Sequence, residues 1–414
     1  MTTTATGQTG LELDERAAKA LPRGVSGHFS PQVNWPGSPH FIARAEGSRI
    51  WDVDGNEYID MMCSWGPIVV GHLNPQVEEA VARQHAMVDC GPGAAPVMVD
   101  LAEKLVSLID DGAWTLFAKN GADVTTLAVT LARAHTGKRT VLVANGAYHG
   151  SLPWCNPDVQ GTVPGDRADL AYFDFNDLDS VRAAIEAHQG DVAALIVSPY
   201  RQPAGFDQQA PDREFAVGLR ELCDQHEALL IHDEVRTGMR LELGTAWRRF
   251  GVAPDMSAWG KAIANGYALA ALVGKEEVRE AAAKVFATGS FWWTGDAMAA
   301  SLATLEIMER DDSLAKMNSW GTSFQQGILA AAEARGVEVV VTGPPTMPYA
   351  RFVADDDDRA IADIFTAACG KHGLYLHPRH NWFVSAAMDG RDLDQALTAV
   401  EAGVDAVASG TNIG

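Results

Sequence analysis

The chain is poor in cysteine and has no long hydrophobic run. Its five cysteines are odd in number, scattered and without a CxxC pair, so they fit neither a disulfide framework nor a zinc site. No apolar run approaches the roughly 18–20 residues that span a bilayer, and the first ten residues lack the basic and apolar segments of a signal peptide. We therefore expect a cytoplasmic protein without a membrane span and without a metal site.

Positive charge is also scarce. Lys and Arg total 32 against 54 for Asp and Glu, which gives a net charge of −22. This sign opposes general binding to nucleic acid or to an anionic membrane surface, so we expect neither as a partner. A local basic pocket for a phosphate remains compatible with this negative net charge. The length of 414 residues suits two or three structural units.

The middle of the chain alternates short apolar runs with longer helical patterns, which is typical of a mostly parallel α/β sheet with helices on both faces. The apolar runs expected as strands are 140–144, 193–198, 228–232 and 268–273, and the expected helices include 178–188 and 212–226. Ligands of such sheets gather outside the carboxyl ends of the strands. The segments 145–150, 198–201 and 233–235 follow three of the expected strands, and 260–265 precedes the last one, so we expect ligand contacts in these four segments.

Both ends of the chain predict a second, smaller unit. The pair Asp54-Gly55 lies between two alternating apolar runs in 49–62, a strong hairpin pattern. After residue 306 we expect helices at 312–335 and 359–371 and strands at 337–342, 349–354 and 382–386. We expect three parts: an N-terminal segment packing with the small domain, a large α/β domain that binds the cofactor, and a C-terminal small α+β domain. Their limits are 1–75, 76–305 and 306–414.

Two motifs point to an anion and to a planar ring. The sequence KNGAD at 119–123 leads into a helix expected to begin near Gly121, and glycine there lets backbone N–H groups approach a phosphate. The alternative is an ordinary N-cap. The sequence NGAYHG at 145–150 places Tyr148 between glycines, where its ring can stack on a flat cofactor. The alternative is a tight turn with a half-buried Tyr and His.

Two further motifs supply a carboxylate and an amine. Asp233 ends the apolar run ALLIHD, and a carboxylate at that position requires a cation, either a metal–nucleotide complex or a protonated pyridine nitrogen. The nucleotide alternative fails, because HTGKRT at 135–140 lacks the first glycine and the Ser/Thr of a phosphate-binding loop. Lys261 in WGKAIANG has small and apolar neighbours, so it is either a desolvated nucleophile or a solvated surface lysine.

The order of these four motifs is that of a pyridoxal phosphate site. In such a site Asp233 keeps the pyridine nitrogen protonated, so that the ring withdraws electrons from the substrate. Lys261 forms the internal Schiff base, is displaced by the substrate amine and then shuttles a proton. We therefore expect pyridoxal 5′-phosphate as the cofactor.

These residues resemble the class III (ω) aminotransferases, fold-type I enzymes that include the ω-amine transaminases and glutamate semialdehyde aminomutase. The resemblance extends over 21–408 and is strongest in five segments: 50–75, 131–138, 147–150, 233–238 (DEVRTG) and 254–261 (PDMSAWGK). It implies a large domain with a mostly parallel seven-stranded sheet and a smaller α+β domain from both chain ends. It also implies a homodimer with shared active sites.

The resemblance implies a role for several residues. Lys261 and Asp233 match the catalytic lysine and the partner of the ring nitrogen. Val235 would pack on the ring face opposite Tyr148, with His149 beside it. The remaining residues implied to bind the cofactor are Asn120, Gly121 and Ala122 in the phosphate loop and Ser290, which reaches the phosphate from the second subunit.

Departures from the family pattern bear on the substrate. The usual Ser-Gly-Thr-Glu loop reads Asn-Gly-Ala-Asp here, and 290–294 reads SFWWT. KNGAD, GSFWW and HPRHNWFVSA are similar to aminotransferases that deaminate hydrolysed fumonisin, a long aliphatic aminopolyol. The similarity favours an amine:2-oxo acid transaminase that uses an acceptor such as pyruvate, with an aminomutase as the alternative. A third hypothesis is a non-catalytic protein that only binds the cofactor.

Aromatic and arginine side chains are the candidate substrate contacts. An apolar pocket would be lined by Trp65, Phe291, Trp292 and Trp382, although an aromatic cluster can also be plain core. Arg379 is the first candidate to hold the acceptor carboxylate and Arg201 is the second, because arginine binds carboxylates bidentately. The natural amine, the preferred acceptor and the stereochemistry stay open.

Overall fold

The structure is a computed structural model that describes residues 9–22, 24, 38–39, 41–355 and 359–410. Its contacts divide the chain into two compact units. The large unit comprises Pro75–Pro203 and Gln208–Leu314. The small unit comprises Met1–Asn74, Ala204–Asp207 and Ala315–Gly414. The domain limits expected from the sequence stay a prediction.

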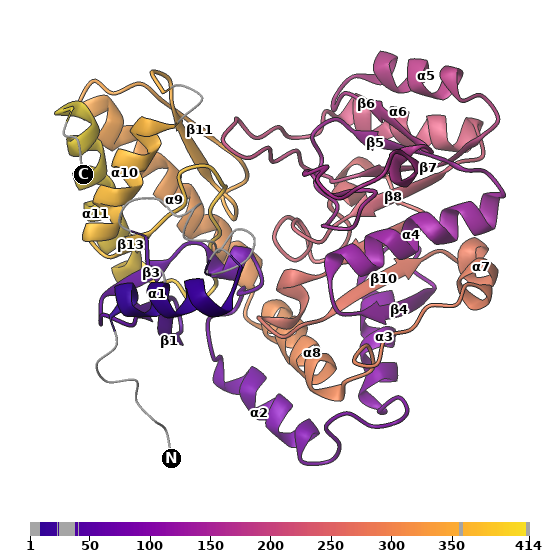
Figure 1. The fold of residues 1–414 in the computed structure, drawn as a ribbon, viewed down its shortest axis with the longest axis horizontal. Helices are drawn as coiled ribbons and strands as arrows, with labels where there is room; N and C mark the ends of the chain where they lie inside the picture. The colour runs from indigo at the N-terminus through magenta and orange to yellow at the C-terminus, as the bar shows by residue number, and fades with distance from the viewer. Residues whose placement is uncertain (1–8, 23, 25–37, 40, 356–358, 411–414) are drawn as a thin grey trace. The chain divides into compact units, whose positions relative to one another are not determined.

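The large unit contains the seven-stranded sheet that the sequence predicts (Figure 1). Its strands are β4 (Trp114–Ala118), β5 (Thr140–Ala144), β6 (Leu170–Phe173), β7 (Val192–Val197), β8 (Leu229–Asp233), β9 (Met256–Trp259) and β10 (Ala270–Gly274). They follow the order β4-β10-β9-β8-β7-β5-β6. Only β10 runs antiparallel to its neighbours, and the other pairs are parallel. The α/β fold class with a mostly parallel sheet is confirmed.

Helices cover both faces of this sheet. Val141 and Val143 of β5 pack with α4 (Gly121–Thr136), whereas Leu142 and Ala144 pack in the opposite cluster. That second cluster includes α5 (Leu178–Ala187) and α6 (Arg213–Gln225), which lie across the sheet from α4 (Figure 1). Successive residues of a strand point to opposite faces of the sheet. Because both faces are covered by helices, the residues that point to either face must be apolar, so the strands appear in the sequence as continuous apolar runs. The other helices of the unit are α2 (Pro75–His85), α3 (Val97–Leu108), α7 (Arg279–Lys284) and α8 (Gly295–Arg310).

The small unit is built from both chain ends. Its four-stranded sheet has the order β1-β2-β3-β13, and β11 and β12 form a separate pair. The strands are β1 (Ile42–Glu46), β2 (Arg49–Asp52), β3 (Glu57–Asp60), β11 (Val339–Thr342), β12 (Tyr349–Phe352) and β13 (Leu374–Tyr375). The helices are α1 (Gly10–Ala20), α9 (Ser313–Ala334), which begins in the large unit, α10 (Ala360–Lys371) and α11 (Gly390–Ala408).

The expected hairpin is present. β2 and β3 pair antiparallel across a turn in which Gly55 has φ +88°, a conformation that favours glycine. The side chain of Asp52 accepts hydrogen bonds from the N–H groups of Asp54 (3.0 Å) and Asn56 (2.8 Å), which closes the turn.

The strand expected at 382–386 is not formed, and this prediction was wrong. The N–H groups of this segment donate alternately to two separate partners. Trp382 and Val384 bond to the carbonyls of Pro348 and Thr346, whereas Phe383 and Ala386 bond to those of Met61 and Val69. A segment divided between two partners makes no regular ladder with either, although every residue in it is apolar or small.

Candidate active site

The carboxyl end of β8 places a buried carboxylate beside a buried imidazole. Asp233 is the last residue of β8, and its Oδ2 lies 2.6 Å from His149 Nδ1. Oδ1 accepts a hydrogen bond from the N–H of Val235 at 3.1 Å. The carboxylate is therefore held at both oxygens, by its own chain and by the loop after β5, because the carboxyl ends of the parallel strands β5, β7 and β8 lie at the same edge of the sheet.

His149 is fixed from several sides. Its carbonyl accepts a hydrogen bond from Thr125 Oγ1 at 2.7 Å, and its ring lies nearly parallel to Trp154, with centroids 6.4 Å apart. The ring is buried, and Nε2 has no hydrogen-bond partner among the described residues. A buried polar atom without a partner is costly, so its persistence indicates a group that a ligand could meet.

Val235 brings three of the sequence motifs together. A Cβ atom on Gly121 would lie 2.7 Å from Val235 Cγ1, and one on Gly260 would lie 3.4 Å from the same atom. A Cβ on Gly150 would lie 2.5 Å from that of Ala122. Val235 thus packs against Gly121 and Gly260, while Gly150 packs against Ala122, and the contacts at Gly121 and Gly150 leave no room for a side chain.

The start of α4 is organised for an anion. Asn120 is the N-cap, and the carboxylate of Asp123 accepts its N–H at 2.8 Å. Gly121 and Ala122 are the first two helical residues, whose N–H groups have no partner within a helix. Those donors and the helix dipole suit a phosphate, although Ala122 offers no hydroxyl there.

Lys261 has the electrostatics of a nucleophilic amine. It opens a short 3-10 turn, Lys261–Ala264, directly after β9, with φ +49°, a strained value for a residue other than glycine. Burial and Arg236 lower the pKa of its amine, Asp233 raises it and Arg240 lowers it, and the net result is a pKa of about 7. At neutral pH a large share of this amine is therefore unprotonated. Tyr148, half exposed, has its pKa raised by burial.

The segment around Ser290 is exposed. Ser290 lies at the surface, and its carbonyl is 3.9 Å from Cys90 Sγ. The Phe291 ring is 61% exposed and lies 5.8 Å from Lys119 Nζ, next to the phosphate loop. Trp292 is partly buried and packs against the core cluster that contains α4.

The other candidate substrate residues belong to the small unit. The Trp65 ring lies edge-on to His377 (5.2 Å) and to His380 (5.0 Å). Arg379 Nη2 forms an ion pair with Asp363 Oδ2 at 3.1 Å. Trp382 is almost fully buried, and its indole N–H donates to the carbonyl of His377 at 2.9 Å.

Two arginines of the large unit lie at the carboxyl edge of the sheet. Arg201, the second candidate for the acceptor carboxylate, donates to Gln209 Oε1 at 3.3 Å, and its Nη2 lies 3.8 Å from the place of a Cβ on Gly146. Arg236 lies within the segment DEVRTG, and no role was predicted for it. Its position three residues after Asp233 was the available signal.

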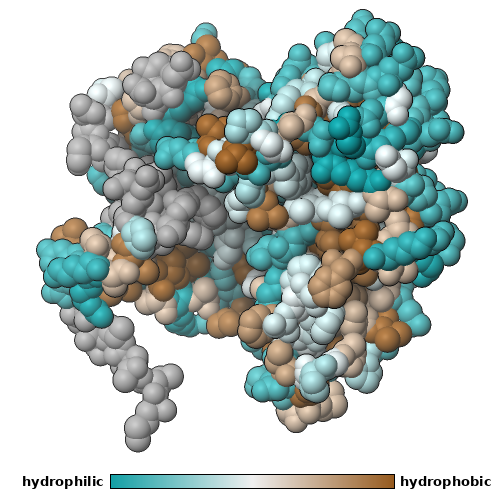
Figure 2. Space-filling model, turned by 45° about the vertical axis from the view of Figure 1, so that its right-hand side comes forward, coloured by the Kyte–Doolittle hydropathy of each residue, from teal (hydrophilic) through white to brown (hydrophobic). Residues whose placement is uncertain are grey.

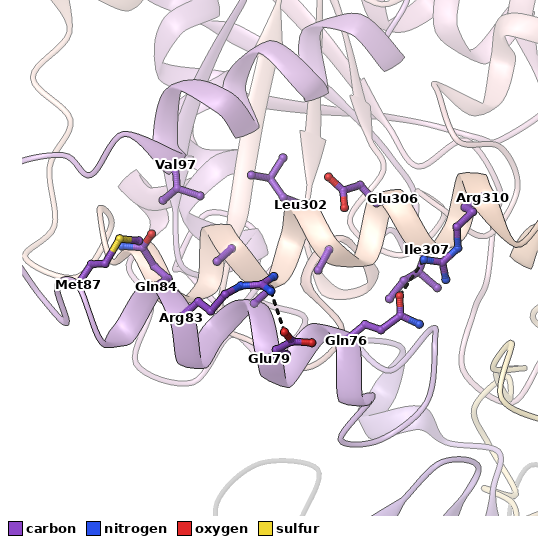
Figure 3. A pocket seen from close by; sticks show the side chains of 13 residues that line it. Gln76, Glu79, Arg83, Gln84, Met87, Val97, Leu302, Glu306, Ile307 and Arg310 are labelled. Atoms are coloured by element: carbon purple, nitrogen blue, oxygen red, sulfur yellow. Dashed lines mark hydrogen bonds and ion pairs between the residues drawn. The ribbon is translucent and has the colours of Figure 1, made fainter.

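Two surface hollows lie elsewhere. One groove of about 380 Å³ runs between α2, α3 and α8, where Arg310 Nη1 donates to Gln76 Oε1 at 2.8 Å (Figure 3). A second, of about 420 Å³, is lined by His135, Arg220 and Asp255 among others. None of the expected site residues lines either hollow. Within the described residues there is no group of His, Cys, Asp or Glu that could hold a metal, and no helix long and apolar enough to cross a membrane.

Comparison with known proteins gives one consistent result. The family described as aminotransferase class-III matches residues 32–389. The aminopentol aminotransferase of Sphingopyxis macrogoltabida is 41% identical over 97% of this chain and 95% of its own length. The 3-aminobutyryl-CoA aminotransferase of Cloacimonas acidaminovorans is 37% identical, covering 94% and 95%. The glutamate-1-semialdehyde 2,1-aminomutase of Chloroherpeton thalassium is 31% identical, covering 87% and 86%.

A solved structure agrees with these relatives. The PLP internal aldimine form of the Sphingopyxis sp. MTA144 FumI protein superimposes with a TM-score of 0.94 at 41% identity, over 96% of both chains. The similarity extends over nearly the whole molecule, well beyond the four motifs.

Proposed function

Because this chain belongs to the class-III aminotransferases, we propose that Lys261 is its cofactor lysine and that it transfers an amino group from a bulky or aliphatic amine to a 2-oxo acid such as pyruvate. The chain is a pyridoxal-phosphate-dependent transaminase of fold type I. The observation that carries the residue assignment is Lys261 itself, a buried amine with a pKa of about 7 near Asp233.

The residues of the large unit fit the cofactor. Because Gly121 and Gly260 carry no side chain, Val235 packs directly against the start of α4 and against the residue before Lys261. The start of α4 offers N–H groups to a phosphate. When bound, pyridoxal phosphate supplies a protonated pyridine ring that stabilises negative charge at the substrate Cα. The buried carboxylate of Asp233 is the group that can keep such a ring nitrogen protonated.

Each side chain then has a definite task. Asp233, oriented by His149, pairs with the ring nitrogen. Val235 and Tyr148 flank the ring, and Asn120, Gly121 and Ala122 hold the phosphate. Lys261 Nζ, neutral in part at pH 7, takes a proton from the substrate carbon and returns it.

Candidate substrate contacts are proposed in each unit. The name of the aminopentol aminotransferase supports an amine that carries several hydroxyl groups for this chain as well. Trp65, Phe291, Trp292 and Trp382 would contact its apolar part. The carboxylate of the acceptor would bind Arg379, after its ion pair with Asp363 opens, or Arg201.

The test is the absorbance of purified protein during an amine half-reaction without acceptor. A transaminase converts its cofactor to the amine form, bleaches the long-wavelength band and releases a ketone or aldehyde. Lys261→Ala should lose this conversion, while Lys284→Ala, which changes an exposed lysine paired with Glu280, should keep it. Release of an isomeric amine without any acceptor would instead support an aminomutase, the activity of more distant relatives. A Lys261→Ala protein that still turns over would overturn the proposal.

The enzyme is further proposed to act as a cytoplasmic homodimer with shared active sites. Exposed Phe286 (90%), Phe291 and Trp293 around Ser290 support a partner surface there, since large aromatic side chains are rarely left in water together. In Figure 2 hydrophobic side chains gather below the mostly hydrophilic region of α5 and α6. All five cysteines are free thiols, which supports a reducing compartment.

Complementation tests the shared sites. Lys261→Ala and Ser290→Asp subunits should each be inactive alone. If Ser290 serves the partner's site, unfolding and refolding them together should restore activity, because one site of each mixed dimer then has both native residues. No recovery in mixed dimers, confirmed by mass, would contradict the shared site, and cell fractionation tests the compartment.

A further inference from the structure

Thr125 is a buried threonine near the start of α4 whose hydroxyl bonds outside its own helix. The residue is 1% exposed, and its Oγ1 lies 2.7 Å from the carbonyl oxygen of His149 and 3.2 Å from that of Ala122. A hydroxyl has one proton to donate, so the shorter distance assigns this proton to His149. Thr130 of the same helix shows the ordinary arrangement, because its hydroxyl donates to the carbonyl of Thr126. Thr125 therefore links α4 to the loop after β5.

The helix and this loop lie close together. A Cβ on Gly150 would lie 2.5 Å from that of Ala122, so the backbone of the loop packs directly against the start of α4. Further along the loop, the indole N–H of Trp154 donates to a hydroxyl of α4 at 2.8 Å. The hydrogen bond from Thr125 differs from these contacts because it holds the backbone of His149 itself.

The imidazole of His149 continues the link to the end of β8. Its Nδ1 lies 2.6 Å from Asp233 Oδ2, and Asp233 Oδ1 accepts the N–H of Val235 at 3.1 Å. Val235 in turn packs on Gly121, where a Cβ would lie 2.7 Å from Val235 Cγ1. The contacts therefore form a closed chain, which runs from α4 through Thr125 and His149 to the end of β8 and returns to the start of α4.

This closed chain joins the two groups that are proposed to hold opposite ends of the cofactor. The start of α4 offers N–H groups to the phosphate, and Asp233 is the proposed partner of the ring nitrogen. A ligand that bonds to two groups at once gains most affinity when their separation is fixed before it binds, because less ordering then opposes binding. Without the Thr125 hydroxyl, the carbonyl of His149 would lose this donor and the loop would be held less firmly.

We propose that Thr125 is a positioning residue whose hydroxyl holds His149, and through it Asp233, at a fixed separation from the phosphate-binding start of α4. Thr125 acts through His149 and not on the reacting atoms. The proposal rests on the proposed roles of Asp233 and of the start of α4. It gives a function to a residue that lies outside the four motifs of the sequence.

The experiment measures the dissociation constant of pyridoxal phosphate by equilibrium dialysis, starting from cofactor-free protein. Thr125→Val keeps the branched side chain and removes the hydroxyl, so we expect binding about 3–10-fold weaker, the loss typical of one hydrogen bond. Thr125→Ser restores a hydroxyl and should bind within about twofold of wild type. Thr130→Val is the matched control, because the hydroxyl that it removes bonds within the same helix at 2.8 Å.

A second readout uses probes that reach only one end of the site. Inorganic phosphate needs only the start of α4, and pyridoxine, which lacks the phosphate, needs only the contacts of the ring. A fixed separation matters only to a ligand that spans both ends, so Thr125→Val should change the affinity for either probe by less than about twofold in calorimetric titrations. If either probe weakens as much as pyridoxal phosphate does, the hydroxyl maintains one end only and the proposal is overturned.

A double-mutant cycle with His149→Phe tests the route. If Thr125 acts through His149, Thr125→Val should weaken cofactor binding little further in the His149→Phe background. Equal losses in both backgrounds, or unchanged binding in Thr125→Val, overturn the proposal. If thermal unfolding shows that Thr125→Val does not fold, Thr125→Ala removes the same hydroxyl. Wild-type affinity in Asp233→Asn would instead contradict the proposed cofactor site, whereas weak binding in Asp233→Asn beside wild-type affinity in Thr125→Val would contradict the role of Thr125 alone.

Discussion

His149 Nδ1 lies 2.6 Å from Asp233 Oδ2, with both side chains buried. An ionised carboxylate can only accept, so the imidazole nitrogen that faces Asp233 carries the proton. The pair joins the loop after β5 to the end of β8 and fixes the direction in which Asp233 presents its charge. The contribution of this hydrogen bond to cofactor binding and turnover can be measured, because each partner can be substituted separately.

Replacing His149 should weaken both cofactor binding and turnover. His149→Phe keeps the ring's volume but removes a charge-assisted hydrogen bond of about 1.5–3 kcal/mol, so we expect a loss of about 10–100-fold. Cofactor dissociation constants by equilibrium dialysis and kcat with one amine measure it. Trp154→Phe is the control, since it preserves a ring against His149. Equal values for His149→Phe and wild type would mean that the pair has no role in orienting Asp233.

A single methyl group on Gly121 should disturb the site. The added Cβ would lie 2.7 Å from Val235 Cγ1, so Gly121→Ala should cost about 1–3 kcal/mol of stability and weaken cofactor binding. Gly165→Ala is the matched control, because a Cβ there meets nothing within 4 Å. Adding Val235→Ala should restore part of the stability of Gly121→Ala, measured by urea unfolding. Full additivity of the two losses would show that the contact is not the cause.

The stability of cofactor-free protein should depend on the protonation of Lys261. Its amine has a pKa of about 7 when folded, against about 10.4 for an ordinary lysine. Between those values the unfolded chain binds the additional proton, so this group makes the free energy of unfolding rise with pH, by up to about 1.4 kcal/mol per pH unit. Lys261→Met should lack that contribution and be more stable than wild type at pH 7. Lys284→Met should follow wild type, and urea titrations at pH 7, 8 and 9 distinguish the curves.

Glu234, next to Asp233 in the chain, should matter for stability. It is buried and accepts hydrogen bonds from Thr237 Oγ1 and from the N–H of Ala246. Glu234→Ala leaves both donors unpaired and should destabilise the fold by about 3 kcal/mol in urea unfolding. Glu280→Ala, which removes an exposed ion pair with Lys284, should cost far less, because solvent screens such a pair. A loss for Glu234→Ala no larger than for this control would contradict the interpretation.

The arginine that binds the acceptor can be identified by kinetics. Arg379→Met should raise the KM for pyruvate by about 10–100-fold and leave the half-reaction with the amine nearly unchanged, because only the acceptor has the carboxylate. Arg201→Met is tested beside it. If only Arg201→Met raises the KM for pyruvate, Arg201 of the large unit, and not Arg379, binds the acceptor carboxylate.

Local sequence patterns predict much of the fold. The runs at 140–144, 193–198, 228–232 and 268–273 correspond to β5, β7, β8 and β10 within two residues, because a strand buried on both faces must be apolar throughout. The start of α4 at Gly121 and the hairpin at Gly55 follow equally local rules of capping and turn geometry. The apolar pattern at 382–386 predicted a strand. The sequence could not show that the N–H groups of this segment donate to two different partners.

The sequence by itself determined the order of the chemical groups along the chain: a phosphate loop, Tyr148 with His149, Asp233 and then Lys261. Only the tertiary structure decided which of them meet. The contact of Val235 with Gly121, the pairing of His149 with Asp233 and the hydrogen bond from Thr125 to His149 join segments far apart in sequence. Burial and Coulomb interactions depend on distances in space, and those distances exist only after the sheet has brought the ends of its strands together.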